Sequence, residues 1–120
     1  GLPLVESLRV AFQSSLEGEG GDFRFIYFNS LNWALKTSLG GGRRLMRETL
    51  HVISSVHVAL EEGGTQEVAV RTHDGSWIVG KKVDRRELIV VYEQSSDTLL
   101  DIEVKVKKLA DSFLGHILWL

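Results

Sequence analysis

The stretch WIVGKKVDRRELIVVYE, residues 77–93, contains two apolar runs separated by a charged tip. In the first run Trp77 and Val79 alternate toward one side, which is typical of a β-strand, and we expect Trp77 to be a core residue. The second run is apolar from Leu88 to Tyr92, as in a strand that is buried on both faces. Asp84 can start a turn between the runs by bonding its own backbone. We therefore predict a hairpin whose second strand, residues 86–93, lies centrally in a sheet.

The residues before this hairpin predict a further strand and a long helix. EVAVRT (67–72) alternates like a strand, and the Asp-Gly pair in His73–Ser76 is a strong hairpin signal. From about Arg43 to Glu62, apolar side chains recur at three- and four-residue steps, which predicts a helix. This stripe comprises Met46, Leu50, Ile53, Val56, His57 and Leu60. Gly63 and Gly64 follow, as glycines commonly do at the C-terminal end of a helix.

The spacing of apolar residues also predicts the secondary structure toward both ends of the chain. FRFIYFN (23–29) reads as a buried strand, and WALKTSL (33–39) alternates like an edge strand with one wet face. Residues 1–22 predict a short helix after Pro3 and then a glycine-rich linker. Near the other end, Leu99 to Phe113 fit a helix, although Ile102, Val104 and Val106 also alternate like a strand. The Ser-Ser-Asp run before this segment offers N-cap oxygens and favours the helix.

The predicted element order is α-β-β-α-β-β-β-α, which is an α/β (α+β) pattern. Tight hairpins make neighbouring strands antiparallel, while the long helix crosses from the second strand to the third. We expect a five-stranded antiparallel sheet with helices on its faces and with the first and fifth strands side by side in the centre. This is the longin or roadblock architecture, over residues 23–120. Such platforms are usually interaction modules, although a fold alone does not assign a function.

Length and composition set outer bounds on the function. A chain of 120 residues is one domain by length, and its formal charge of −2 provides no global attraction to nucleic acid. With no cysteine there is no thiolate nucleophile and no cysteine-ligated metal. No apolar run is long enough to span a membrane. Because the chain starts at Gly1 and its only methionine is Met46, we expect a fragment of a longer protein.

The sequence predicts no catalytic residues, no cofactor and no metal site. His51 and His57 are six residues apart, so they do not form the one-turn pair that binds a metal on a helix. His57 lies on the apolar stripe and is interpreted as a core histidine with its hydrogen bonds satisfied. No G-x-S-x-G turn or other nucleophile constellation is present. We expect that the domain is not an enzyme.

Two groups of basic residues are candidates for anion binding. LGGGRRL (39–45) precedes a helix N-terminus, so Arg43, Arg44 and Arg47 could bind phosphate, but the loop lacks the ending of a P-loop. We favour a flexible connection there. The second group lies at the hairpin tip and comprises Lys81, Lys82, Arg85 and Arg86.

The hairpin tip is interpreted first as a solvated tip of mixed charge. The alternative is a patch for anionic lipid headgroups, phosphoinositides included, or for an acidic partner. Each basic group near an anionic membrane contributes about 1 kcal/mol, and two nearby acids offset part of it. No aromatic residues interleave with the basic ones, so we do not expect nucleic acid binding.

Three stretches resemble the C-terminal region of the Ccz vacuolar fusion protein family. They are FIYFNSLNWALKTS, WIVGKKVDRRELIVV and the lysine-bearing segment around VKKLADSF. The resemblance covers most of residues 23–120, and its most specific element is the run from Trp77 to Leu88. Residues 1–20 and 39–65 contribute little to it. The chain looks like the third of three longin domains in that family.

This resemblance implies a set of partners. Ccz proteins pair with Mon-type subunits, and the heterodimer is a guanine nucleotide exchange factor for the Rab-seven class of GTPase on late endosomes and vacuoles. Exchange in that family uses the first longin domains of both subunits. The third domain is therefore expected to be a scaffold for the Mon-type subunit, a regulatory subunit or membrane approach. The implied location is cytoplasmic, peripheral on late endosome, vacuole or lysosome membranes.

Overall fold

The computed structural model describes residues 23–30, 33–38, 45–93 and 96–118. These residues form five strands and two helices. They are β1 (Phe25–Ser30), β2 (Trp33–Ser38), α2 (Arg47–Glu61), β3 (Glu67–Arg71), β4 (Trp77–Val83), β5 (Arg86–Tyr92) and α3 (Leu99–Leu118). The predicted N-terminal helix and linker, residues 1–22, lie outside the described residues. The α+β class is as predicted, and the segment after residue 99 is a helix and not a strand.

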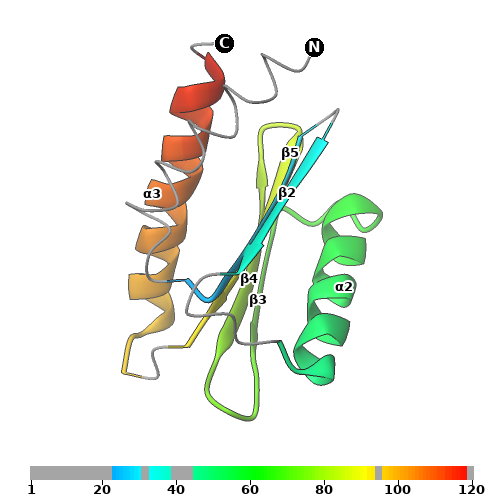
Figure 1. Cartoon of the computed structure of the whole chain (residues 1–120), viewed down its shortest axis with the longest axis vertical. Coiled ribbons are helices and arrows are strands. Elements are labelled where there is room, and N and C mark those ends of the chain that lie inside the picture. The colour runs from blue at the N-terminus through cyan, green and yellow to red at the C-terminus, as the bar shows by residue number, and fades with distance from the viewer. Residues whose placement is uncertain (1–22, 31–32, 39–44, 94–95, 119–120) are drawn as a thin grey trace.

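The strands form one antiparallel sheet in the order β2-β1-β5-β4-β3, with α2 and α3 on its opposite faces (Figure 1). β5 lies in the middle, with β1 beside it, and β2 and β3 form the two edges. Leu88, Ile89, Val90, Val91 and Tyr92 are each at most 1% exposed. An unbroken apolar run is therefore the pattern of a strand that is covered on both sides.

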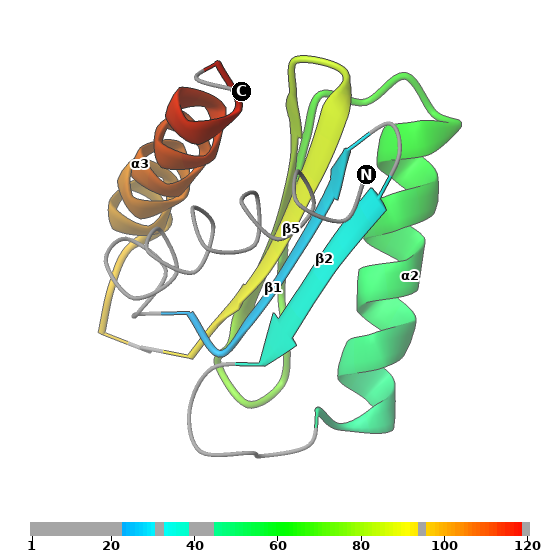
Figure 2. The same ribbon diagram turned by 45° about the horizontal axis from the view of Figure 1, so that its top comes forward.

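Alternation along the strands divides the core into two clusters. On one face Leu88, Val90 and Tyr92 of β5 pack with α3, where the ring of Phe28 lies 4.8 Å from that of Phe113. On the other face Ile89 and Val91 pack with Ile78 and α2. Figure 2 shows the two helices on either side of the sheet. Trp77, predicted to be a core residue, is only partly buried and packs at the margin of the α3 cluster.

The long helix begins later than predicted. Leu45 and Met46 are not helical, and Met46 is the N-cap, with extended backbone (ψ 152°) and no side-chain cap. The start at Arg43 was therefore wrong, and Met46 does not belong to the helical stripe. The other end agrees with the prediction, because Gly64 follows the helix with a φ of 66°, which favours glycine.

The N-cap of α3 is Thr98, one residue after the predicted Ser-Ser-Asp cap. The Thr98 hydroxyl accepts from the Asp101 N–H at 3.2 Å, and the Asp101 carboxylate accepts from the Thr98 N–H at 3.0 Å. This reciprocal pair is a capping box. Asp97 instead accepts from the hydroxyl of buried Tyr92, which also accepts from Lys105 Nζ at 2.9 Å. Burial, then the bond to Asp97, raises the pKa of Tyr92.

The turn of the β4–β5 hairpin has an unusual backbone at Asp84. Its φ is 62°, in the left-handed region, and the two-residue loop Asp84-Arg85 joins paired Val83 and Arg86. A positive φ in a two-residue hairpin loop is a conformation that normally favours glycine. Aspartate tolerates this conformation better than most residues.

α2 packs closely against the sheet at Gly80. A Cβ atom placed there would lie 2.3 Å from Val56 Cγ1 and 2.9 Å from Leu60 Cδ1. Both neighbours are buried, so they have little room to move. Glycine at this position of β4 therefore allows α2 to pack directly on the strand.

We expect Gly80→Ala to destabilise the domain by about 1–3 kcal/mol, because the added methyl overpacks the α2 contact. Gly115→Ala is the matched control, since Gly115 lies in α3 with nothing near the added methyl. It should stabilise the protein by about 0.5–1 kcal/mol through helix propensity. Urea denaturation measures both. Equal stabilities for the two variants would contradict the close packing at Gly80.

Loss of the α3 capping box should cost stability in a pH-dependent way. Thr98→Ala is expected to cost about 1 kcal/mol. The backbone and hydroxyl bonds of Thr98 hold the pKa of Asp101 below its usual value of 3.8. A depressed pKa stabilises the fold above the unfolded pKa, and this contribution is lost as pH falls through the folded one. The Asp101→Asn variant should therefore melt below wild type at pH 7, and the difference should shrink below about pH 3.8.

Candidate functional site

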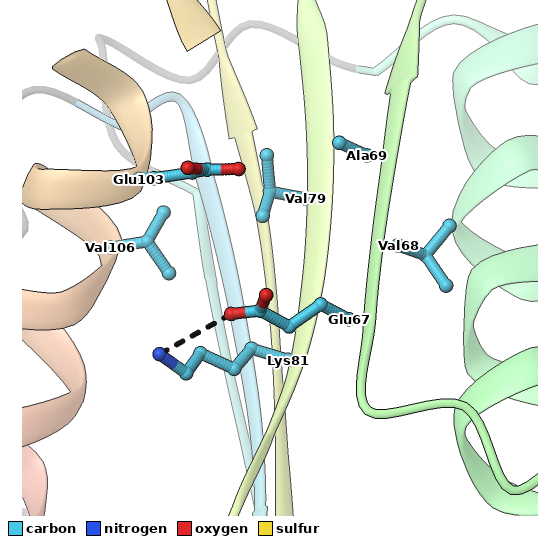
Figure 3. A pocket seen from close by; sticks show the side chains of 7 residues that line it. All are labelled: Glu67, Val68, Ala69, Val79, Lys81, Glu103 and Val106. Carbon is cyan, nitrogen blue, oxygen red and sulfur yellow. Dashed lines mark ion pairs between the residues drawn. The ribbon is translucent and has the colours of Figure 1, made fainter. Parts of the chain in front are cut away.

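The basic residues of the hairpin do not form one patch. Lys81 and Lys82 are consecutive in β4, so their side chains point to opposite faces of the sheet. Lys81 lies on the α3 face, where its Nζ is 3.4 Å from a carboxylate oxygen of Glu67 in β3 (Figure 3). Lys82 is on the α2 face, directly opposite Glu87 of β5. The predicted cluster is thus divided by the sheet itself.

The arginines of the tip differ from each other as well. Arg86 donates to Asp84 at 3.0 Å, and its side chain is only 17% exposed. Arg85 is exposed. Arg47, in the first turn of α2, is also exposed, and α2 begins at the opposite end of the sheet from the β4–β5 tip (Figure 1). Arg43 and Arg44 lie outside the described residues. Lys81, Lys82, Arg85, Arg86 and Arg47 therefore share no common surface.

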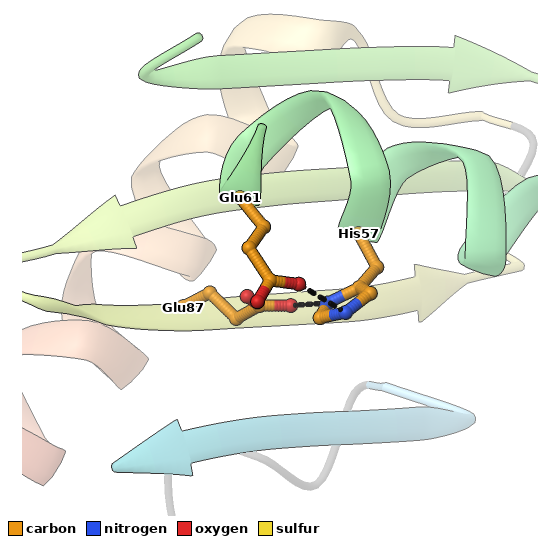
Figure 4. Close-up of side chains that lie close together, drawn as sticks. All are labelled: His57, Glu61 and Glu87. Atoms are coloured by element: carbon orange, nitrogen blue, oxygen red, sulfur yellow. Dashed lines mark hydrogen bonds and ion pairs between the residues drawn. The ribbon is translucent and has the colours of Figure 1, made fainter. Parts of the chain in front are cut away.

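His57 is the centre of a charged contact between α2 and the sheet (Figure 4). Its Nε2 is 2.7 Å from a carboxylate oxygen of Glu61, one turn along the helix, and its Nδ1 contacts the Glu87 carboxylate. The His57 side chain is 34% exposed, so the interpretation as a core histidine was wrong. Its hydrogen bonds are satisfied, as predicted. The contact joins α2 to the central strand.

Glu87 is the unexpected member of this contact. Its side chain is only 4% exposed, although it follows the exposed tip directly. The sequence alone suggested a surface acid that offsets the basic tip, but strand alternation places it under α2. Tyr27 of β1 lies nearby, with its ring 6.2 Å from the imidazole at 82°. Burial, then the charges of Glu87 and Glu61, raises the pKa of Tyr27.

Two grooves border α2. One, of about 370 Å³, lies toward β1 and is lined by Phe25, Tyr27, Leu50, Ile53, Ser54, His57 and Ile89. The other, of about 880 Å³, lies toward the β3 edge and is lined by Met46, Glu48, Thr49, Val52 and Val70–Asp74. Three large apolar side chains of this region are about half exposed. They are Met46, Leu50 and Val58 at 55%, 49% and 50%. The helix thus presents apolar surface on its open side.

The groove found on the α3 face is smaller than those beside α2. This groove, of about 200 Å³ between β3 and α3, is lined by the Lys81–Glu67 pair, Glu103 and apolar side chains (Figure 3). Among residues 99–115 of α3, the exposed large apolar side chains are Leu100 and Val104, at 69% and 49%. β3 is an edge strand whose residues alternate between exposed and half-buried, so its outer backbone groups have no strand partner in the described sheet.

Comparison with known families assigns this domain. A family model described as Intu longin-like domain 3 matches residues 19–109. The chain belongs to the Intu longin-like domain 3 family. The match includes residues 39–65, where the resemblance to Ccz proteins gave no guidance. The prediction of a third longin domain is therefore confirmed.

Curated relatives carry the Ccz name that the sequence suggested. The chain is 32% identical over 96 residues to a Vacuolar fusion protein CCZ1 homolog of Dictyostelium discoideum, covering 79% of the chain and 22% of the relative. It is 34% identical over 118 residues to the Nematostella vectensis homolog, covering 90% and 25%. The chain thus spans about a quarter of the length of these relatives, whose name indicates a part in trafficking to the vacuole.

Solved structures support the fold. The gliding protein MglB of Thermus thermophilus matches with a TM-score of 0.59 at 11% identity, covering 92% of this chain and 88% of that one. Myxococcus xanthus MglB matches with a TM-score of 0.60 at 13% identity, covering 94% and 96%. At this identity the likeness concerns the fold only. In the described part of the chain, no helix has the length and apolarity to span a membrane.

We expect His57→Leu to destabilise the domain by about 1–3 kcal/mol, because Glu87 would keep a buried charge without its partner. The double variant His57→Leu/Glu87→Leu should recover much of that loss, since a buried ionic contact is often replaced by apolar packing at little cost. A double-mutant cycle in urea measures the coupling. If the two single effects simply add, Glu87 does not depend on His57.

Proposed function

We propose that this chain is a non-catalytic protein-interaction domain within a subunit of a heterodimeric guanine nucleotide exchange factor. The whole complex would act on a Rab-seven class GTPase in late endosome and vacuole trafficking. Membership of a longin-like family and the vacuolar fusion name of the relatives support this proposal. The partner proposed for this domain is a Mon-type longin subunit. A regulatory subunit could share the scaffold, and the protein would be cytoplasmic and peripheral on these membranes.

The open face of α2 is the observation that carries the proposal. When a partner covers a half-exposed apolar side chain, the burial of that surface contributes a favourable free energy of roughly 25 cal/mol per Å². Val58 of α2 is half exposed, and Met46, the N-cap, and Leu50 line the two grooves that border the helix. The outer edge of β3, which has no partner strand in the described sheet, lies beside one of these grooves and offers backbone hydrogen bonds. Apolar surface next to an open strand edge suits a protein partner.

The alternative of phosphoinositide reading has less support. It required Lys81, Lys82, Arg85 and Arg86 to act together, but these residues point to different faces and two of them have acidic partners. Of the four, Arg85 is exposed and the other three are half-buried. Each exposed cation contributes only about 1 kcal/mol of binding free energy near an anionic membrane. Basic residues that face different sides of the sheet would therefore bind such a membrane weakly.

Val58→Lys tests the proposed surface, and Val104→Lys is a closely matched control. Both are valines within a helix, 50% and 49% exposed, one in the last turn of α2 and one in α3. We expect Val58→Lys in the full-length protein to weaken co-purification with the Mon-type subunit, by about tenfold or more in Kd. Val104→Lys should leave it unchanged. Equal binding by wild type and both variants would exclude α2 as the partner surface.

Two further measurements test the wider proposal. Deleting residues 1–120 from the full-length protein should reduce assembly with the Mon-type subunit, whereas normal assembly would rule out the scaffold role. The isolated domain should not accelerate nucleotide release from the GTPase in a single-turnover assay. Acceleration there would show that this domain carries exchange activity itself.

A further inference from the structure

His57, Glu61 and Glu87 bring one imidazole and two carboxylates to the same point, between α2 and β5 (Figure 4). His57 and Glu61 are four residues apart, so they lie one above the other on one side of the helix. Glu87 reaches the same point from the central strand. One ring nitrogen or carboxylate oxygen from each of the three lies within 4.8 Å of the other two.

The burial of Glu87 calls for a positive charge at this point. Its side chain is 4% exposed, and among the described residues its carboxylate pairs with His57. Lys82 stands opposite Glu87 in the β4–β5 pairing but forms no ion pair with it. A neutral imidazole would leave the carboxylate with a hydrogen bond but without a counter-charge. Glu61 adds a second negative group on the other side of the ring.

We propose that His57, Glu61 and Glu87 bind one divalent transition-metal ion of the zinc class. An imidazole nitrogen with carboxylate oxygens is a donor set that zinc uses in proteins, whereas magnesium prefers oxygen alone. The ion would balance the charge that Glu87 buries and the charge of Glu61. It would also tie α2 to β5, the two elements that supply the ligands.

To hold such an ion the side chains of His57 and Glu61 have to turn, because Glu61 contacts Nε2 and Glu87 contacts Nδ1, whereas one ring nitrogen must face both carboxylates. Ligand atoms about 2.0 Å from a tetrahedral zinc are roughly 3.3 Å apart. His57 Nε2 and the Glu61 oxygen are already 2.7 Å apart. The side chains of Glu61 and His57 are 60% and 34% exposed, so their torsions can adjust, while Glu87 is held by the core. This same exposure leaves the fourth position open to water.

Calorimetric titration of the 120-residue chain with ZnCl₂ at pH 7, and separately with MgCl₂, tests the proposal. We expect one zinc ion per chain and no comparable magnesium binding. Glu61→Gln removes a ligand at an exposed position, so this variant should fold and bind zinc at least about tenfold more weakly. Glu62→Gln is the matched control, because it makes the same change at the next, exposed residue, outside the cluster. It should bind like wild type.

Imidazole NMR resonances provide a second readout that does not depend on heat signals. Zinc should shift the ring signals of His57 before those of His51 and His73, which lie outside the cluster. Zinc should also raise the melting temperature of wild type and of Glu62→Gln, but not that of Glu61→Gln. Equal affinity in Glu61→Gln and wild type, or no zinc binding at millimolar concentration, would overturn the proposal and leave the three groups as an ionic contact alone.

Discussion

The burial of β5 on both faces is the constraint on which the other elements depend. Leu88, Val90 and Tyr92 face α3, while Ile89 and Val91 face α2, so consecutive residues belong to two different cores. A strand of this kind has to lie in the middle of the sheet, with a neighbour on each side and a helix on each face. β1 and β4 satisfy the first requirement, and the two helices satisfy the second.

The position of α2 follows from this constraint and from Gly80. The helix packs on β3, β4 and β5, and the missing side chain at Gly80 lets it settle over β4. Because α2 is placed over that half of the sheet, Phe25 and Tyr27 of β1 are only partly covered and line a groove beside it. The open surface near α2 is thus a geometrical result of where the helix can approach closely.

Much of the fold could be predicted from local pattern, because each strand and helix has its own period. The unbroken run at Leu88–Tyr92 and the glycines at 63 and 64 indicated a central strand and a helix end that the structure contains. Boundaries were less predictable, since Met46 suits the helical stripe by spacing and only its backbone shows that it is the cap. At the start of α3, Thr98 is the N-cap in place of the Ser-Ser-Asp run, and Asp97 accepts a hydrogen bond from the hydroxyl of Tyr92.

The site was harder to predict, for two different reasons. The division of Lys81 from Lys82 follows from strand alternation and was available from the sequence, but counting basic residues along the hairpin concealed it. The contact between His57 and Glu87 joins residues thirty positions apart. Nothing local in the sequence pairs them, because the pairing depends on how α2 crosses the sheet. The spacing of residues along the helix predicts only the contact between His57 and Glu61, which are one turn apart.

Glu87 also influences which position α2 takes on the sheet, apart from its effect on the stability of the domain. An apolar residue at this position would extend the apolar run of β5 and leave the close contact at Gly80 as the main feature that distinguishes neighbouring registers of α2. A buried carboxylate makes those registers unequal, because it is satisfied only where His57 reaches it. A slip of α2 by one turn would bring Ile53 or Glu61 toward Glu87 in place of the imidazole, and neither can serve as its partner. The charged contact therefore selects one position of α2, and with it the placement of the exposed apolar residues on its outer side.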